Sequence, residues 1–257
     1  MRIHQIRNAT VVVEAAGQRI LVDPMLGLPG TLPPYSLVRF RARMNPLTGL
    51  PENAAKTLDG ITAGIISHTH FGMDCDHLDR AGAKLLASAG APVFCGRPDE
   101  NNLRRRGLQA VPLALADGRP FAGGTITAFD AAHGRCVMRK LMGPGAGYFL
   151  EFPGEPSLYI AGDTILTDSV RRVLAEKKPD VCIIPAGSAQ LDFGNPILMS
   201  LPEILEFLRL APGMVVANHM EALNHCPTTR EALAAAAGTA GLADRLRVPT
   251  DGEALTF

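Results

Sequence analysis

The sequence has no tryptophan and only three tyrosines, and it has no excess of charge of either sign. Lysine and arginine number 25 together, as do aspartate and glutamate, so the formal net charge is zero. A neutral chain has no overall electrostatic attraction to nucleic acid or to an anionic membrane. We therefore expect neither as a partner, and any charged substrate must be met by a local patch.

Long apolar runs and paired cysteines are also missing. No run reaches the roughly 18 apolar residues of a membrane span, and the start of the chain, MRIHQIRNATVVVE, lacks the apolar block of a signal peptide. The five cysteines are odd in number and scattered, without a CxxC pair, which argues against a disulfide framework and against a thiolate zinc site. We expect a cytoplasmic protein.

Three short strands are predicted at the start of the chain, at 2–6, 9–14 and 19–23, with a turn at Ala16-Gly17-Gln18. This pattern indicates an antiparallel meander. Six prolines then occur between Pro24 and Pro51. A loop of this length in a compact domain is usually functional, so we interpret it as a lid or wall over a site.

Apolar runs and helix-like segments alternate in the rest of the chain. This alternation predicts an α/β protein with sheets flanked by helices, and its 257 residues are compatible with a single domain over 1–257. Strands are expected at 64–67, 93–95, 125–129, 147–152, 158–161, 181–185 and 214–217, and helices from near Asp76, around 103–106, and at 168–177, 202–210 and 229–240.

Two histidines leave a predicted strand together in Ile65-Ile66-Ser67-His68-Thr69-His70. Residues i and i+2 of a strand project to the same side, so His68 and His70 can bind one ion. The sequence Asp76-His77-Leu78-Asp79 follows. An aspartate at the N-cap of the expected helix would anchor this turn and leave His77 free to point back toward the pair.

Three more polar residues follow apolar runs in the same way: His133, Asp163 and His219. Strands that end on one edge of a sheet bring such residues together. Imidazoles and carboxylates without a thiolate suit one or two divalent transition-metal ions, zinc in the first place and manganese or iron as alternatives.

With these motifs in this order, the chain resembles the metallo-β-lactamase superfamily, and within it the group that includes ascorbate-phosphate lactonases. The resemblance covers nearly the whole chain and implies a four-layer αββα sandwich with a metal site at one edge. The motifs that carry it are Ile20–Pro24, Ser67–His70, Asp76–Asp79, Ala132-His133, Gly162–Thr164 and Ala217–His219.

The resemblance also implies the roles of individual residues. The first metal ion would be held by His68, His70 and His133. The second ion would be held by Asp76, His77 and His219, with Asp163 bridging both. Asp23 would order the site through hydrogen bonds rather than bind metal.

One departure from the family pattern leaves alternatives open. The family has one residue between the second histidine and the Asp-His pair, whereas five residues, Phe71 to Cys75, stand here. Asp74 is therefore an alternative to Asp76, and the protein holds one metal ion or two. His225 is likewise an alternative to His219 as a ligand.

The implied activity is hydrolysis of an ester, lactone or phosphoester bond in a small molecule. A metal ion lowers the pKa of water from about 15.7 toward 7 and supplies hydroxide. Asp163 would position this hydroxide and accept its proton, and we hypothesise that His225 is a catalytic proton donor or oxyanion partner. A non-catalytic metal- or ligand-binding module, or a nuclease or phosphodiesterase acting on nucleic acid, is the alternative; the oligomeric state stays open, a homo-oligomer included.

Basic residues alternate with apolar ones at Arg39, Arg41 and Arg43 in the proline-rich loop. If this segment is extended, its arginines form one stripe that can receive phosphate or carboxylate. The alternative is a solvated loop face.

Overall fold

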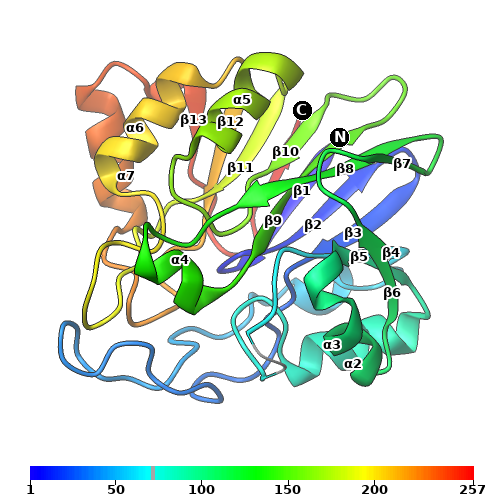
Figure 1. The fold of residues 1–257 in the computed structure, drawn as a ribbon, viewed down its shortest axis with the longest axis horizontal. Coiled ribbons are helices and arrows are strands. Elements are labelled where there is room, and N and C mark those ends of the chain that lie inside the picture. The colour runs from blue at the N-terminus through cyan, green and yellow to red at the C-terminus, as the bar shows by residue number, and fades with distance from the viewer. Residues whose placement is uncertain (71–72) are drawn as a thin grey trace.

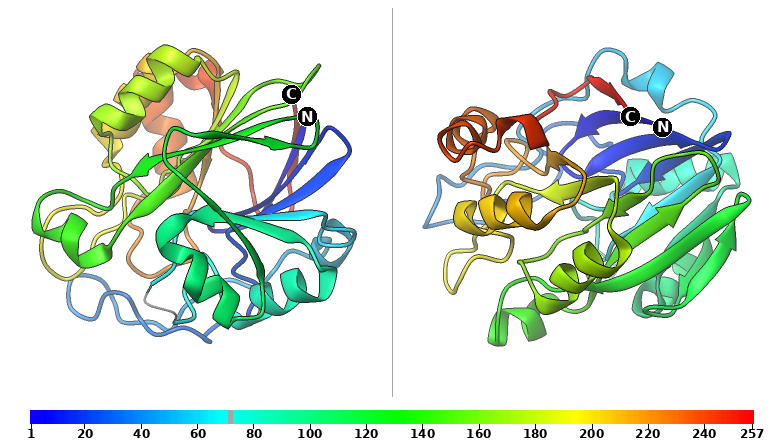
Figure 2. Two further views of the ribbon diagram at one scale, coloured as in Figure 1. Left: turned by 45° about the vertical axis from the view of Figure 1, so that its right-hand side comes forward. Right: turned by 90° about the horizontal axis from the view of Figure 1, so that it is seen from above.

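Two seven-stranded sheets face each other in the computed structural model, with helices on their outer sides (Figures 1 and 2). The structure describes residues 1–70 and 73–257; Phe71 and Gly72, in the segment between His70 and Asp76, lie outside the described residues. The predicted four-layer αββα sandwich is confirmed.

The first sheet contains the N-terminal meander. Its order is β14-β1-β2-β3-β4-β5-β6. The pairs β1·β2 and β2·β3 are antiparallel, as the sequence predicted, and β3 to β6 run parallel. Its strands are β1 (Arg2–Arg7), β2 (Thr10–Ala15), β3 (Gln18–Val22), β4 (Ala63–Ile66), β5 (Pro92–Gly96), β6 (Gln109–Leu113) and β14 (Ala254–Thr256).

The second sheet follows the same plan, with an antiparallel part followed along the chain by a parallel part. Its order is β13-β12-β11-β10-β9-β8-β7, with β7 to β10 antiparallel and β10 to β13 parallel. Its strands are β7 (Gly118–Phe121), β8 (Gly124–Ala131), β9 (Gly145–Glu151), β10 (Leu158–Ile160), β11 (Val181–Pro185), β12 (Met214–Asn218) and β13 (Leu246–Arg247).

Helices cover the outer face of each sheet. Helices α2 and α3 lie on the first sheet, and α5, α6 and α7 lie on the second (Figure 1). None of the helices in the described part of the chain is long and apolar enough to cross a membrane. The helices are α1 (Ala54–Thr57), α2 (Arg80–Ala89), α3 (Glu100–Arg105), α4 (Val137–Met142), α5 (Asp168–Lys177), α6 (Leu201–Leu210) and α7 (Arg230–Thr239).

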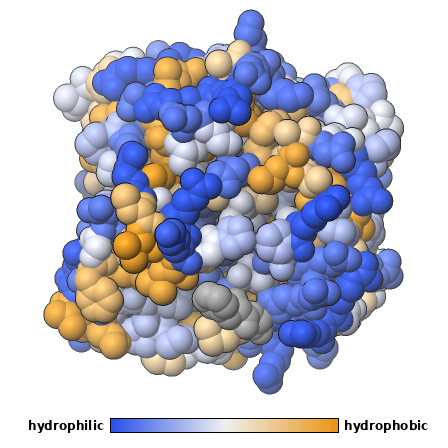
Figure 3. Space-filling model, in the orientation of Figure 1, coloured by the Kyte–Doolittle hydropathy of each residue, from blue (hydrophilic) through white to orange (hydrophobic). Residues whose placement is uncertain are grey.

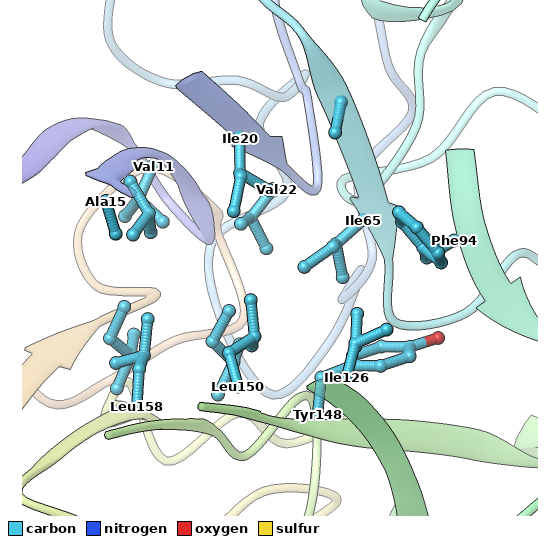
Figure 4. Packing of buried hydrophobic residues seen from close by; sticks show 14 of the residues in the cluster. Val11, Ala15, Ile20, Val22, Ile65, Phe94, Ile126, Tyr148, Leu150 and Leu158 are labelled. Atoms are coloured by element: carbon cyan, nitrogen blue, oxygen red, sulfur yellow. The ribbon is translucent and has the colours of Figure 1, made fainter. Parts of the chain in front are cut away.

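Alternating strand residues supply both the inner and the outer cores. In β2, Val11 and Val13 belong to the core between the sheets, whereas Val12 belongs to the core beneath the helices of the first sheet. Both faces of a central strand are therefore apolar, because each is buried against another layer. Figure 4 shows side chains of the two sheets meeting, with Ile20 and Ile65 above and Leu150 and Leu158 below.

The helix that was expected to begin near Asp76 begins four residues later, and its N-cap is the second aspartate of Asp76-His77-Leu78-Asp79. Helix α2 begins at Arg80, and the carboxylate of Asp79 caps it by accepting from Gly82 N at 2.8 Å. The other oxygen of Asp79 accepts from Gly27 N at 2.6 Å. Since Asp79 does the capping, the carboxylate of Asp76 stays available to the site.

The loop from Pro24 to Pro51, all of it described, has no helix or strand beyond the isolated bridge between Leu32 and Asn45. The fully buried Arg7 fixes its start and end by donating to the carbonyl oxygens of Met25, Gly27 and Thr48. The loop is therefore a fixed wall of the molecule in this structure.

Candidate metal centre

The seven predicted ligands lie together at one edge of the sandwich. His68 and His70 follow β4, His133 follows β8, Asp163 follows β10 and His219 follows β12. Residues that follow strands of both sheets thus contribute side chains to the cluster. The side chains form two groups, and within each group the ligand atoms lie within 4.8 Å of one another. The first group is His68, His70 and His133, and the second is Asp76, His77, Asp163 and His219.

In the first group, the Nε2 atoms of His68 and His70 are 3.1 Å apart. Two nitrogens bound to one zinc ion at 2.0–2.1 Å in tetrahedral geometry lie about 3.3 Å apart. The ring of His133 is 4.5 Å from that of His68, centroid to centroid. The spacing of the three imidazoles therefore fits a shared ion.

In the second group, the carboxylate of Asp76 faces two imidazoles, with its Oδ2 3.2 Å from Nε2 of His219 and 3.4 Å from Nε2 of His77. The Oδ2 atom of Asp163 is 3.1 Å from Nε2 of His77 and 3.2 Å from Nε2 of His133. Asp163 thus contacts both groups, which is the position that a bridging ligand needs.

The Nε2 atom of His77 is buried and has no hydrogen-bond partner among the described residues. It is nevertheless within 3.4 Å of carboxylate oxygens of Asp76 and Asp163. The ring nitrogen and the carboxylate oxygens therefore lie close together, but their directions do not suit a hydrogen bond. A cation is the partner that satisfies all three, and this nitrogen and oxygen donor set suits zinc, manganese or iron.

The surroundings shift the pKa values of these groups in opposite directions. Burial lowers the pKa of His68 well below its usual value and that of His70 to about 4. Burial also lowers the pKa of His77 and His219, but nearby carboxylates, Asp163 first, outweigh it and raise both well above 6.5. Protons thus balance the carboxylates of the second group in the metal-free protein.

Asp23 lies behind the ligands, as the resemblance implied. Its Oδ1 accepts from Ser67 N at 2.7 Å, and its Oδ2 lies 3.0 Å from Nδ1 of His77. The hydroxyl of Ser67 is 3.1 Å from Nδ1 of His68 and 3.2 Å from Nδ1 of His77. Asp23 and Ser67 therefore orient two of the imidazoles through their Nδ1 atoms and leave the Nε2 atoms facing the other candidate ligands.

Asp99 supports the histidine pair, and the sequence analysis missed it. Its Oδ1 accepts from the amide of Thr69 at 2.9 Å and from the Thr69 hydroxyl at 2.6 Å. Thr69 stands between His68 and His70, so this carboxylate fixes the turn that carries both. Burial raises the pKa of Asp99 to about 6. The signal was present, because Asp99 follows strand β5 just as the ligands follow theirs.

The alternatives for single ligands separate clearly in space. Asp74 is paired with Arg106 at 3.0 Å at the surface, whereas Asp76 is buried in the second group. His219 belongs to that group, and His225 belongs to neither group of described residues. Cys75, close to the ligands in sequence, is a buried free thiol outside both groups.

The arginine stripe does not form. Residues 38–41 form a turn, so Arg39, Arg41 and Arg43 do not alternate along an extended segment. The carboxylate of Asp192 causes this turn by accepting from the amides of Val38 and Arg39, each at 3.0 Å. Of the two interpretations, the solvated loop face agrees with the structure.

His225 and Tyr35 lie next to the second group. The rings of Tyr35 and His225 make an edge contact at 5.1 Å. The hydroxyl of Tyr35 is buried without a hydrogen-bond partner in the described chain, and burial together with the Asp76 carboxylate raises its pKa far above 10. The sequence analysis missed Tyr35, because nothing in a proline-rich loop shows where one tyrosine points.

A buried cluster of imidazoles and carboxylates at the edge of an αββα sandwich defines a metal-dependent hydrolase of the metallo-β-lactamase fold. The family described as "Beta-lactamase superfamily domain" matches residues 18–220. The chain belongs to this superfamily and, within it, to the UPF0173 family of metal-dependent hydrolases.

Three relatives illustrate the similarity. The UPF0173 protein YddR of Bacillus subtilis (strain 168) is 32% identical over 260 residues, 100% of each chain. A UPF0173 metal-dependent hydrolase of Flavobacterium johnsoniae is 23% identical, over 87% of this chain and 91% of its own. The crystal structure of an isothiocyanate hydrolase from Delia radicum gut bacteria is 30% identical, with a TM-score of 0.89 over 100% of this chain and 99% of the other.

Proposed function

We propose that this protein hydrolyses a small molecule with one or two divalent metal ions held by the two groups of ligands. The observation that carries the proposal is the buried Nε2 of His77, which lies between two carboxylates without a hydrogen bond to either. A buried polar atom in this position is satisfied by a cation. The proposed ligands are His68, His70 and His133 for one ion, and Asp76, His77 and His219 for the other, with Asp163 between them.

The residues of the chain have distinct roles in this proposal. When bound, the ions supply Lewis acidity and make hydroxide available near neutral pH. Asp163 orients the attacking group and accepts its proton, since it stands where the two groups meet. His225 is the proposed proton donor to the leaving group, because it is buried beside the second group and belongs to neither.

The bond that is cleaved is an ester or lactone bond in the first place. A lactone substrate agrees with the ascorbate-phosphate lactonase group that the motifs resemble. A phosphoester is less favoured, because the arginines of the long loop do not form the anion-binding stripe that the sequence suggested.

An isothiocyanate is the second candidate substrate, since one similar protein is an isothiocyanate hydrolase. Its central carbon is electrophilic, as a lactone carbonyl carbon is. Figure 3 shows hydrophobic residues gathering at the lower left of the molecule. Apolar side chains that are more than half exposed stand on α4, on the long loop and on the segment between β11 and α6. Among them are Leu37, Val38, Val137, Leu141 and Phe193, and they favour a substrate with an apolar part.

The test combines metal analysis with an activity panel. The purified protein, loaded with zinc or manganese, is assayed on a lactone, a carboxylic ester, a phosphodiester and an aryl isothiocyanate. The His68→Ala variant should lose metal and activity together. The matched control is His4→Ala. His4 lies on strand β1, pairs with Glu14 of β2 and belongs to neither group. Abundant metal without hydrolysis of any substrate would favour the non-catalytic binding module.

A further inference from the structure

Tyr35 is the residue that the proposed function leaves unexplained. We infer that Tyr35 is a catalytic residue, whose hydroxyl donates a hydrogen bond to the substrate atom that gains negative charge during hydrolysis. This inference rests on the proposed function and names a residue of the same site.

The first argument is the hydroxyl itself. The Oη atom of Tyr35 is buried and has no hydrogen-bond partner among the described residues. Leaving a buried donor unpaired costs free energy, and a phenylalanine would fill the same space without that cost. A ligand that accepts from the hydroxyl explains why a tyrosine stands here.

The second argument is the direction of the side chain. The ring packs against a small apolar cluster that contains Met25, Leu32 and Leu223, and its edge contact with His225 lies at 5.1 Å. The hydroxyl at the far end of the ring lies near the carboxylate of Asp76, which is in the second ligand group. The donor is therefore held at the metal centre while the ring is held away from it.

The third argument is that the backbone around Tyr35 is fixed before any ligand binds. The amide of Tyr35 donates to Oδ1 of Asn224 at 2.9 Å, and Nδ2 of Asn224 donates to the carbonyl oxygen of Ser36 at 2.7 Å. The hydroxyl of Ser36 donates to Asp192. A donor held in place at a developing charge stabilises the transition state without a reorganisation cost.

A positioning role is the competing explanation. In that case the hydroxyl would act only through Asp76, by orienting this carboxylate toward its ion. The two roles differ in what a Tyr35→Phe variant loses: substrate contact affects ligand binding and turnover, whereas positioning of Asp76 affects the affinity for metal.

The experiment compares Tyr35→Phe with Tyr159→Phe in zinc-loaded protein. Tyr159 also has a buried hydroxyl without a partner in the described chain, but it belongs to the core beneath the helices of the second sheet. The measurements are zinc affinity, the affinity for methylphosphonate, whose tetrahedral anion resembles the reacting centre after attack, and kcat and KM on the substrate found in the panel.

The expected result is a loss of methylphosphonate affinity of about 10- to 100-fold in Tyr35→Phe, as expected for a hydrogen bond to a charged acceptor. A fall in kcat of similar size should accompany it, because the contact is stronger in the transition state. Zinc affinity should stay within about twofold of wild type, and Tyr159→Phe should match wild type in all three measurements.

Two outcomes would overturn the inference. Unchanged methylphosphonate affinity and kcat would remove Tyr35 from the reaction, and a fall in zinc affinity of the same size as the fall in kcat would assign the hydroxyl to Asp76. A wild-type protein that binds methylphosphonate but cleaves no substrate would count against the proposed function alone.

Discussion

His77 and His219 carry protons in the metal-free protein that a metal ion must displace. The pKa of each lies well above 6.5, because neighbouring carboxylates outweigh burial. The charged imidazoles stabilise the metal-free fold fully below pH ~6.5, and this contribution is lost as the pH rises through the raised values. A ligand imidazole must be neutral, so metal affinity should increase with pH.

We therefore expect proton release when the metal-free protein is titrated with zinc at pH 7. The number of protons is obtained from calorimetric titrations in two buffers with different ionisation enthalpies. Both of the protonated histidines contribute, so release should approach two protons per chain when the second group fills. Identical heats in the two buffers would contradict the assignment of His77 and His219 as ligands.

Replacement of Asp23 by asparagine tests the residues behind the ligands. Asp23 fixes both Ser67 and His77, and loss of such a contact typically costs about 10- to 100-fold in metal affinity. Asp180→Asn is the control, because that carboxylate accepts from Ser157 at the surface. Equal zinc affinity in the two variants would show that Asp23 does not orient His77.

The clustering of the seven proposed ligands could be predicted from the sequence, because each of them follows a strand or opens the next turn. Tyr35 and Asp99 were missed. The amide of Tyr35 donates to Asn224, 189 residues further along the chain, and the neighbouring Ser36 donates to Asp192, 156 residues further along. No local pattern records such contacts. Asp99 follows strand β5, but its partner Thr69 follows β4, and the sequence does not show that the two residues meet.

Helix α2 packs unusually close to the chain that leaves β3. A Cβ atom on Gly82 would lie 2.2 Å from the carbonyl oxygen of Pro24, so only glycine fits at this point. Gly238, within α7, has nothing within 4 Å of the same position. The two glycines therefore separate packing from helix propensity.

We expect opposite effects from the same substitution at these two positions. Gly238→Ala should stabilise the protein by about 0.5–1 kcal/mol, the helix propensity difference. Gly82→Ala should destabilise it by about 1–3 kcal/mol, since the backbone must shift. Urea unfolding measures both, and stabilisation by Gly82→Ala would show that α2 is free to move away from Pro24.

The strands that sequence patterns missed lie at the edges of the sheets. Strands β6 and β7 contain Pro112 and Pro120, which lowered their strand signal. Both are edge strands, where a residue without an amide hydrogen is tolerated. Strand β14 has only three residues, and its pairing with β1 joins distant parts of the chain, so it was not predictable from local periodicity.

Metal removal should change the stability of the whole molecule. An ion at 100 times its dissociation constant stabilises the folded state by about 2.7 kcal/mol, which corresponds to roughly 5–10 °C in Tm for a chain of this size. Calorimetry before and after treatment with a chelator measures this shift. An unchanged Tm in wild type would contradict metal binding by the folded state, and an equal shift in His68→Ala would contradict binding through His68.

Each group of ligands is divided between the two halves of the chain. His68 and His70 come from the first half and His133 from the second, and likewise Asp76 and His77 are joined by Asp163 and His219. The chain crosses from one sheet to the other between β6 and β7. Two fragments separated at this crossing, 1–116 and 117–257, would each lack part of both groups. Tight uptake of metal is then a property of the reassociated pair, so zinc could serve as a reporter of fragment complementation.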